Sequence, residues 1–221
     1  MADSSLTERK IMEVLEWTYD KVLTGGMGID SAQDLADSYL KENGSLENKI
    51  NSLIRWQNTK SATSGFLTGI GGLATMPVAV PANFASVMFV QIRMVAAIAH
   101  MCGYDIKDDQ VKTFVYACLT GNAIKDMLKD VGIIVGSKLT RKAIEGISGK
   151  MLIEINKRVG FRLFTKFGTK GVINLGKAIP LVGGVIGASF DGISTNIVGN
   201  TARDLFFHNQ SSKRSTIIDL N

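Results

Sequence analysis

Hydrophobic residues recur at helical spacing along most of this 221-residue chain. Strand signals are scarce, because apolar and polar residues seldom alternate and no Asn-Gly or Asp-Gly turn joins two β-branched runs. The pattern predicts an all-α fold, a single compact domain of about eight to ten helices. In the first predicted helix, from about Leu6 to Leu23, the apolar face carries Ile11, Val14, Leu15, Thr18 and Val22.

The longest uncharged stretch runs from Ser61 to Ile92. Pro77 and Pro81 interrupt it, and because proline removes a backbone donor and disfavours helix in the residue before it, we expect two helices joined by a proline turn. The second helix continues to Cys102 and ends at Gly103, which suits the position just after a helix. We predict that this glycine-rich apolar hairpin is the centre of the fold.

Small residues recur at helical spacing in the first half of the hairpin and in a helix predicted from Leu181 to Phe207. Such spacing lets helix backbones approach closely, whereas phosphate binding would need a Gly-Lys-Ser or Gly-Lys-Thr ending that is absent. The predicted packing glycines are Gly65, Gly69, Gly72, Gly183 and Gly187.

Polar signals delimit other helices. Asp30 is placed to cap a second helix and Ser45 a third, and Gly121 interrupts a helix predicted from about Asp108 to Lys129. We divide the chain into residues 1–44, amphipathic helices packed on the core; residues 45–207, the main helical domain; and residues 208–221, a disordered polar tail.

Positive charge is concentrated in one region. Between Lys138 and Lys177 ten Lys or Arg residues face two acids, a net charge of +8, whereas the whole chain carries +5 and the remainder therefore −3. The region is a candidate surface for an anionic partner.

The clearest surface signal is a basic amphipathic helix from Lys150 to Phe167. Arg158, Arg162 and Lys166 follow at every fourth position beside an apolar face, a pattern typical of helices that lie on anionic lipid. A solvated face over an ordinary core contact is the alternative, and no nucleic-acid-binding motif accompanies the charge. The predicted surface for lipid or another anionic partner comprises Lys150, Lys157, Arg158, Phe161, Arg162, Phe164, Lys166 and Lys170.

The uncharged hairpin has two interpretations. Residues 61–76 are too short to span a bilayer, and residues 82–102 are long enough but carry Asn83, Gln91 and Arg93. It is either a buried hairpin or one that dips into a membrane.

Arg93 lies in this apolar stretch, where an unpaired buried charge would be costly. We therefore expect that it either faces solvent or pairs with an acid from elsewhere, for which Asp191 is the candidate.

Catalytic chemistry finds little support. The two histidines and two cysteines form no metal-ligand spacing, and no hydrolase motif occurs, so we predict no metal and no cofactor. Acids near Asp105 or Asp191 leave a hydrolase-like enzyme as an alternative. The start of the chain lacks a secretory signal pattern, so we expect a cytoplasmic location.

The order of these features resembles the EcsC family. The stretch GFLTGIGGLATMPVAVPANFASVMFVQIRMVAAIAHMCGYD and the later block IPLVGGVIGASFDGISTNIVGNTARDLFF carry the likeness, which spans roughly Ser45 to Phe207. The chain has Asn83 and Asp191 where the family often has Asp and Asn. The matching positions are Pro77, Gln91, Arg93, Gly103, Tyr104, Asp105, Pro180, Asp191, Ala202 and Arg203.

The resemblance implies a bacterial, membrane-associated helical protein, with an ABC transporter among its possible partners, and it supplies no catalytic residues. Our first hypothesis is therefore a non-enzymatic protein at the inner face of the membrane, bound to anionic lipid or to a membrane protein and not to nucleic acid. The alternatives are a membrane-inserting, permeabilising effector, a hydrolase-like enzyme, and a soluble scaffold that binds an acidic protein.

Overall fold

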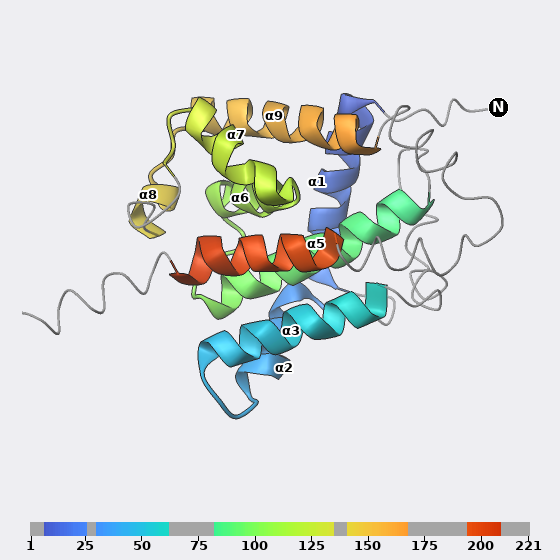
Figure 1. Ribbon diagram of the computed structural model, residues 1–221, viewed down its shortest axis with the longest axis vertical. Helices are drawn as coiled ribbons and strands as arrows, with labels where there is room; N and C mark the ends of the chain where they lie inside the picture. The colour runs from blue at the N-terminus through green and yellow to red at the C-terminus, as the bar shows by residue number, and fades with distance from the viewer. Residues whose placement is uncertain (1–6, 26–29, 62–81, 135–140, 168–193, 209–221) are drawn as a thin grey trace, which may run out of the picture.

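The computed structural model describes residues 7–25, 30–61, 82–134, 141–167 and 194–208 (Figure 1). Within these ranges the chain forms helices and connecting turns and no β-strand, so the all-α prediction is confirmed. The helices are α1 (Glu8–Thr24), α2 (Ala32–Leu40), α3 (Leu46–Ser61), α5 (Ala82–Met101), α6 (Asp109–Cys118), α7 (Ile124–Asp130), α8 (Arg141–Glu145) and α9 (Gly149–Phe167). A last helix covers residues 194–203 and continues as the π-helix η3 (Asp204–His208).

Helix α5 is the central element. Helices α1 and α2 make their largest contacts with it, and α3 and α6 also pack against it. In Figure 1, α2 and α3 lie on one side of α5 and α6 and α9 on the other. Helix α9 rests on α1 and α6 at the edge of the bundle.

The sequence of α5 explains its position. It contains a single charged residue, Arg93, apart from His100, and its residues from Phe84 onward are almost all buried. The window Phe84–Met101 is long and apolar enough to cross a membrane, but 89% of it is buried inside the protein. The helix ends as predicted at Gly103, whose φ of 80° is left-handed and whose N–H bonds to the His100 carbonyl at 2.8 Å.

The helix starts differ in part from the prediction. Ser45 caps α3, since its Oγ accepts a hydrogen bond from the Asn48 N–H at 3.2 Å. The cap of α2, however, is Ser31 and not Asp30, because Ser31 and Asp34 form a reciprocal capping box. The predicted helix over 108–129 is broken at Gly121, which has a φ of 61° and starts a 3₁₀ turn.

Close helix contacts at glycine occur in the described part of the chain. A Cβ placed on Gly199 would lie 2.9 Å from Ile54, and one on Gly160 would lie 3.3 Å from Met12. The glycines predicted to do this lie outside the described residues, as do Pro77, Pro180, Asp191 and Lys170. The first half of the predicted hairpin and residues 209–221 also lie outside them.

Candidate functional site

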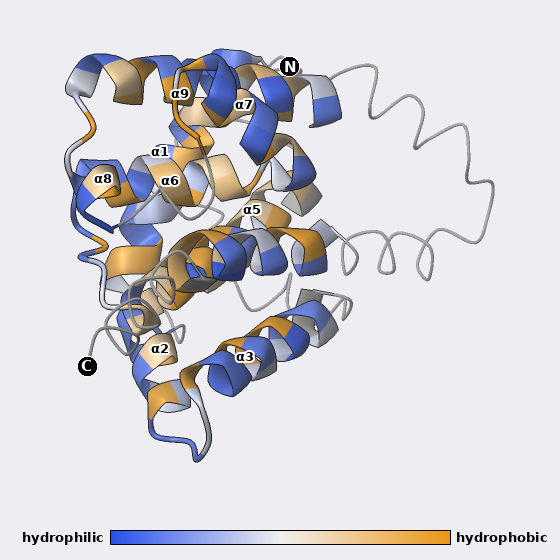
Figure 2. Cartoon of the chain, turned by 60° about the vertical axis from the view of Figure 1, so that its left-hand side comes forward, coloured by the Kyte–Doolittle hydropathy of each residue, from blue (hydrophilic) through white to orange (hydrophobic). Residues whose placement is uncertain are grey.

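Helix α9 is held to the bundle by one face. Ile155, Val159 and Leu163 are fully buried, at the spacing of successive helical turns, and Gly160 admits the side chain of Met12 from α1. Figure 2 shows hydrophilic and hydrophobic residues side by side along α9. The predicted amphipathic helix is therefore present, and its other face is turned away from the core.

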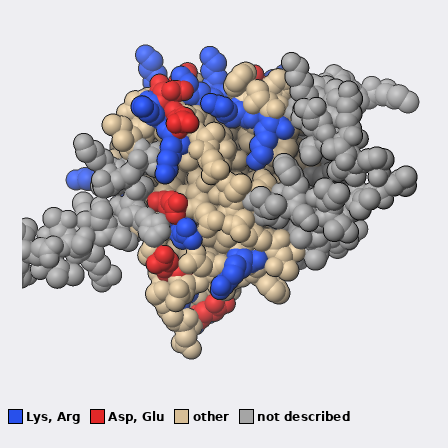
Figure 3. Space-filling view, in the orientation of Figure 1, with Lys and Arg blue, Asp and Glu red and all other residues tan. Residues whose placement is uncertain are grey.

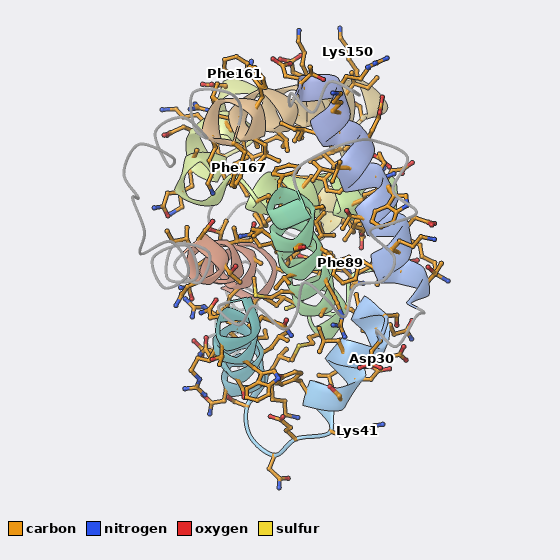
Figure 4. The ribbon with its side chains drawn as sticks, turned by 90° about the vertical axis from the view of Figure 1, so that its right-hand side faces the viewer. Asp30, Lys41, Phe89, Lys150, Phe161 and Phe167 are labelled. Carbon is orange, nitrogen blue, oxygen red and sulfur yellow. The ribbon has the colours of Figure 1, made fainter. Side chains whose placement is uncertain are left out.

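That outward side combines exposed apolar and basic side chains. Ile153 is 72% exposed and Phe161 52%, and Lys157 stands between them in the same row at every fourth position. Lys150 and Arg162 are exposed beside this row. We call these five residues the outer face of α9. Figure 4 labels Lys150 and Phe161 at this edge, and Figure 3 shows Lys and Arg side chains gathered there, with a few acids among them.

Two of the predicted basic residues are engaged within the protein. Arg158 contacts Glu154 at 3.0 Å and Asp130 on α7 at 3.2 Å. Lys166 is exposed along much of its side chain, but its amine donates to the Ser194 hydroxyl at 3.1 Å, and burial lowers the pKa of that amine. The charge of Arg158 is therefore matched by two carboxylates, whereas the Lys166 amine keeps its charge but is tied to the last helix.

The predicted aromatic residues also separate. Phe161 is exposed, whereas Phe164 is partly buried against the core. Phe167, at the end of α9, packs edge-on against Phe84 of α5 with ring centroids 5.4 Å apart. Of the two aromatic residues predicted for the partner surface, Phe161 is therefore the exposed one.

A groove of about 410 Å³ lies beside the outer face of α9. It is formed by α9, by the end of α7 and by the first residue of α1. Its lining comprises Glu8, Met127, Asp130, Glu154, Lys157, Arg158, Phe161 and Arg162. The groove therefore contains three basic and three acidic side chains together with an exposed aromatic ring.

Several positions of the family resemblance connect helices. Gln91 is fully buried, and its amide donates to the hydroxyls of Ser194 and Thr195, each at 3.3 Å. Arg203 donates to the Asn51 side chain on α3 at 2.7 Å, and Ala202 beside it is buried. These residues join the last helix to α5 and α3.

Arg93 has an acidic neighbour that the sequence did not indicate. Its side chain is 7% exposed, and its guanidinium lies 3.7 Å from the carboxylate of Asp30, which is 76% exposed. Burial lowers the pKa of Arg93, while Asp30 and Asp34 act in the opposite direction. An acid from elsewhere was predicted; Asp191, the candidate, lies outside the described residues.

The Gly103-Tyr104-Asp105 segment forms a structural turn. Arg141 of α8 donates to the Gly103 carbonyl, and its guanidinium carbon lies 5.2 Å from the centre of the Tyr104 ring. Asp105 accepts the backbone N–H of Lys107 at 2.9 Å. In the part of the chain that the structure describes, no three His, Cys, Asp or Glu side chains form a metal site.

The model of the EcsC protein family matches residues 4–207. The match begins before α1, so it includes the helices that we assigned to a separate N-terminal part. No protein with a curated description matches the chain, and neither does any solved structure.

Proposed function

This chain belongs to the EcsC protein family, and we propose that it binds the surface of an anionic membrane through the outer face of α9. The observation that carries the proposal is the row of Ile153, Lys157 and Phe161, which the fold leaves exposed while the opposite face of the same helix is buried. Exposed apolar side chains among lysines and arginines are the usual design of a helix that lies in the lipid interface.

The expected strength of binding follows from the residues that remain free. Lys150, Lys157 and Arg162 make no ion pair among the described residues, and each charge near an anionic surface contributes about 1 kcal/mol. Ile153 and Phe161 add the burial of two apolar side chains. The sum describes reversible, salt-sensitive attachment and not permanent insertion.

A second candidate function, membrane insertion, is favoured by the arrangement of helix ends. The glycine-rich stretch 62–81 connects the end of α3 to the start of α5, and stretch 168–193 connects the end of α9 to the last helix. These four ends lie on the same side of the bundle (Figures 1 and 4). A permeabilising effector needs weakly charged segments, and these two stretches carry no charged residue and three charged residues, respectively.

Charge reversal tests the first proposal. Changing Lys150, Lys157 and Arg162 to Glu should abolish flotation with vesicles of anionic phosphatidylglycerol. Salt at about 0.5 M should weaken binding of the wild type, because exposed charges are strongly screened at that ionic strength. The control variant changes Lys41, Arg55 and Lys107, which are exposed on other elements, and alters the net charge equally.

Retained binding of the α9 triple variant, or equal loss in the control, would refute a site on α9. Leakage of a dye trapped in the vesicles separates the two candidates, because surface attachment leaves the bilayer intact. A partner protein such as a transporter is indicated instead if the wild type floats only with vesicles that contain membrane proteins.

A further inference from the structure

We propose that the groove beside α9 binds the phosphoethanolamine headgroup of a lipid. The inference rests on the proposed membrane binding and goes further, because it names one lipid class and the residues that distinguish it. The groove shares Lys157, Phe161 and Arg162 with the outer face of α9, so a headgroup in it would belong to a lipid of the same surface.

The charges of the groove divide into an internal set and a free set. Arg158 is held between Glu154 and Asp130, at 3.0 and 3.2 Å. Glu8, Lys157 and Arg162 make no ion pair or hydrogen bond through their side chains with the described residues. The groove therefore offers two free cations, Lys157 and Arg162, and one free carboxylate, Glu8. Glu154 and Asp130 share Arg158, which cannot donate to all of their oxygen lone pairs, so they can still accept hydrogen bonds.

Glu8 is fixed close to α9 by the packing of α1. The backbone oxygen of Glu8 lies 3.8 Å from the position that a Cβ would take on Gly160. The absence of a side chain at Gly160 thus brings the start of α1 beside Lys157 and Phe161. The start of α1 thus adds a third carboxylate to the groove, beside Asp130 and Glu154, which a site for a simple anion would not need.

A headgroup with both charges matches this arrangement. Lys157 and Arg162 can hold the phosphate, for which arginine has a suitable fork of donors. The carboxylates of Glu8 and Asp130 can accept hydrogen bonds from a primary ammonium group.

Phosphatidylcholine fits less well. Its trimethylated nitrogen has no N–H to donate, and its usual binding sites are cages of aromatic rings, whereas Phe161 is the one aromatic residue in the lining. Phosphatidylglycerol has no cation for Glu8. The chemistry of the groove therefore selects ethanolamine from the common headgroups.

The test compares vesicles of equal negative charge. All contain the same fraction of phosphatidylglycerol, and the remainder is phosphatidylethanolamine or phosphatidylcholine. The full chain should bind the ethanolamine vesicles about tenfold more tightly, the gain expected from a hydrogen bond between charged groups. Glu8→Gln should remove this preference and keep binding to phosphatidylglycerol, whereas Glu13→Gln, on the same helix but outside the groove, should keep both.

A titration without membranes completes the test. Soluble glycerophosphoethanolamine should shift the NMR signals of Lys157, Phe161 and Arg162, and glycerophosphocholine and glycerol 3-phosphate should shift them less at equal concentration. Vesicle binding with no ethanolamine preference and no such selectivity would overturn the headgroup inference and leave the membrane proposal standing. Selective shifts without vesicle binding would overturn the membrane proposal and leave a site for the soluble headgroup.

Discussion

Gly199 lies where the last helix meets α3 and α5, and its neighbours leave no room for a side chain. A Cβ there would lie 2.9 Å from two carbons of Ile54 and 3.2 Å from the end of Met94. Ile54 is itself buried, so it cannot move aside without disturbing the core. Gly132 differs, since its φ is 83° and a Cβ would meet nothing within 4 Å.

Three alanine substitutions separate these effects. Gly199→Ala should lower the free energy of unfolding by about 1–2 kcal/mol, because overpacking exceeds the gain in helix propensity. Gly132→Ala should lose about 1 kcal/mol through backbone strain alone. Gly149→Ala, which has free space in α9, should leave stability equal or higher. Urea denaturation measures the series; equal stability of Gly199→Ala and Gly149→Ala would contradict the packing at Gly199.

The two cysteines give a pH-dependent prediction. Burial raises the pKa of the Cys102 thiol to about 12 and also raises that of Cys118, so the folded protein holds both protons where the unfolded chain loses them. Folding is therefore favoured by these groups below the ordinary thiol pKa and progressively less as the pH rises above it. Iodoacetamide should modify neither residue at pH 8 until the protein is unfolded. Rapid labelling of the native protein would show that the core around them opens.

At the scale of the helices, Arg93 and Asp30 form an unequal pair. The guanidinium of Arg93 is buried, whereas the carboxylate of Asp30 is largely in water. Water and salt screen their attraction, so the pair contributes little to the free energy of unfolding. Arg93 should therefore stabilise the fold mainly through the packing of its side chain and not through its charge.

A double-mutant cycle checks this interpretation. Asp30→Asn should change the free energy of unfolding by less than about 1 kcal/mol, the range of exposed ion pairs. Arg93→Ala should cost about 2–5 kcal/mol through the cavity that it leaves, and Arg93→Met should restore most of the loss. A coupling energy above about 2 kcal/mol between positions 30 and 93 would show a strong pair instead.

Over the whole molecule, the two sides of α5 differ in character. Helix α9 forms the basic edge on one side, and α2 and α3 lie on the other (Figure 1). Between α2 and α3 is a groove of about 570 Å³ whose lining includes Asp30, Glu42 and Arg55. Attachment through α9 would turn this second groove away from the membrane and toward water-soluble partners.

Sequence patterns predicted the helical class, the limits of α9 and the presence of an apolar face along it, because these depend on residues a few positions apart. They did not predict which cations are free. Arg158 is engaged by Asp130 and Lys166 by Ser194, each 28 residues away in the chain. A local sequence pattern contains no information on pairs that are this far apart in the chain.

Asp30 shows the same limit at a helix start. Its position before α2 fits a cap, but Ser31, one residue later, makes the capping box, and the carboxylate of Asp30 lies beside Arg93. Either residue satisfies the local pattern. The contact of Asp30 with Arg93 on α5, which the local pattern does not contain, distinguishes the two residues in the structure.

The contacts of the last helix have a consequence for how the protein is made. Gln91 bonds to Ser194 and Thr195 across 103 and 104 residues, and Arg203 bonds to Asn51 across 152. The faces of α3 and α5 that receive this helix are therefore synthesised long before their cover leaves the ribosome. Because exposed apolar surface on a partly made chain promotes aggregation, these faces are exposed to that risk until the last helix has been synthesised and has packed on them.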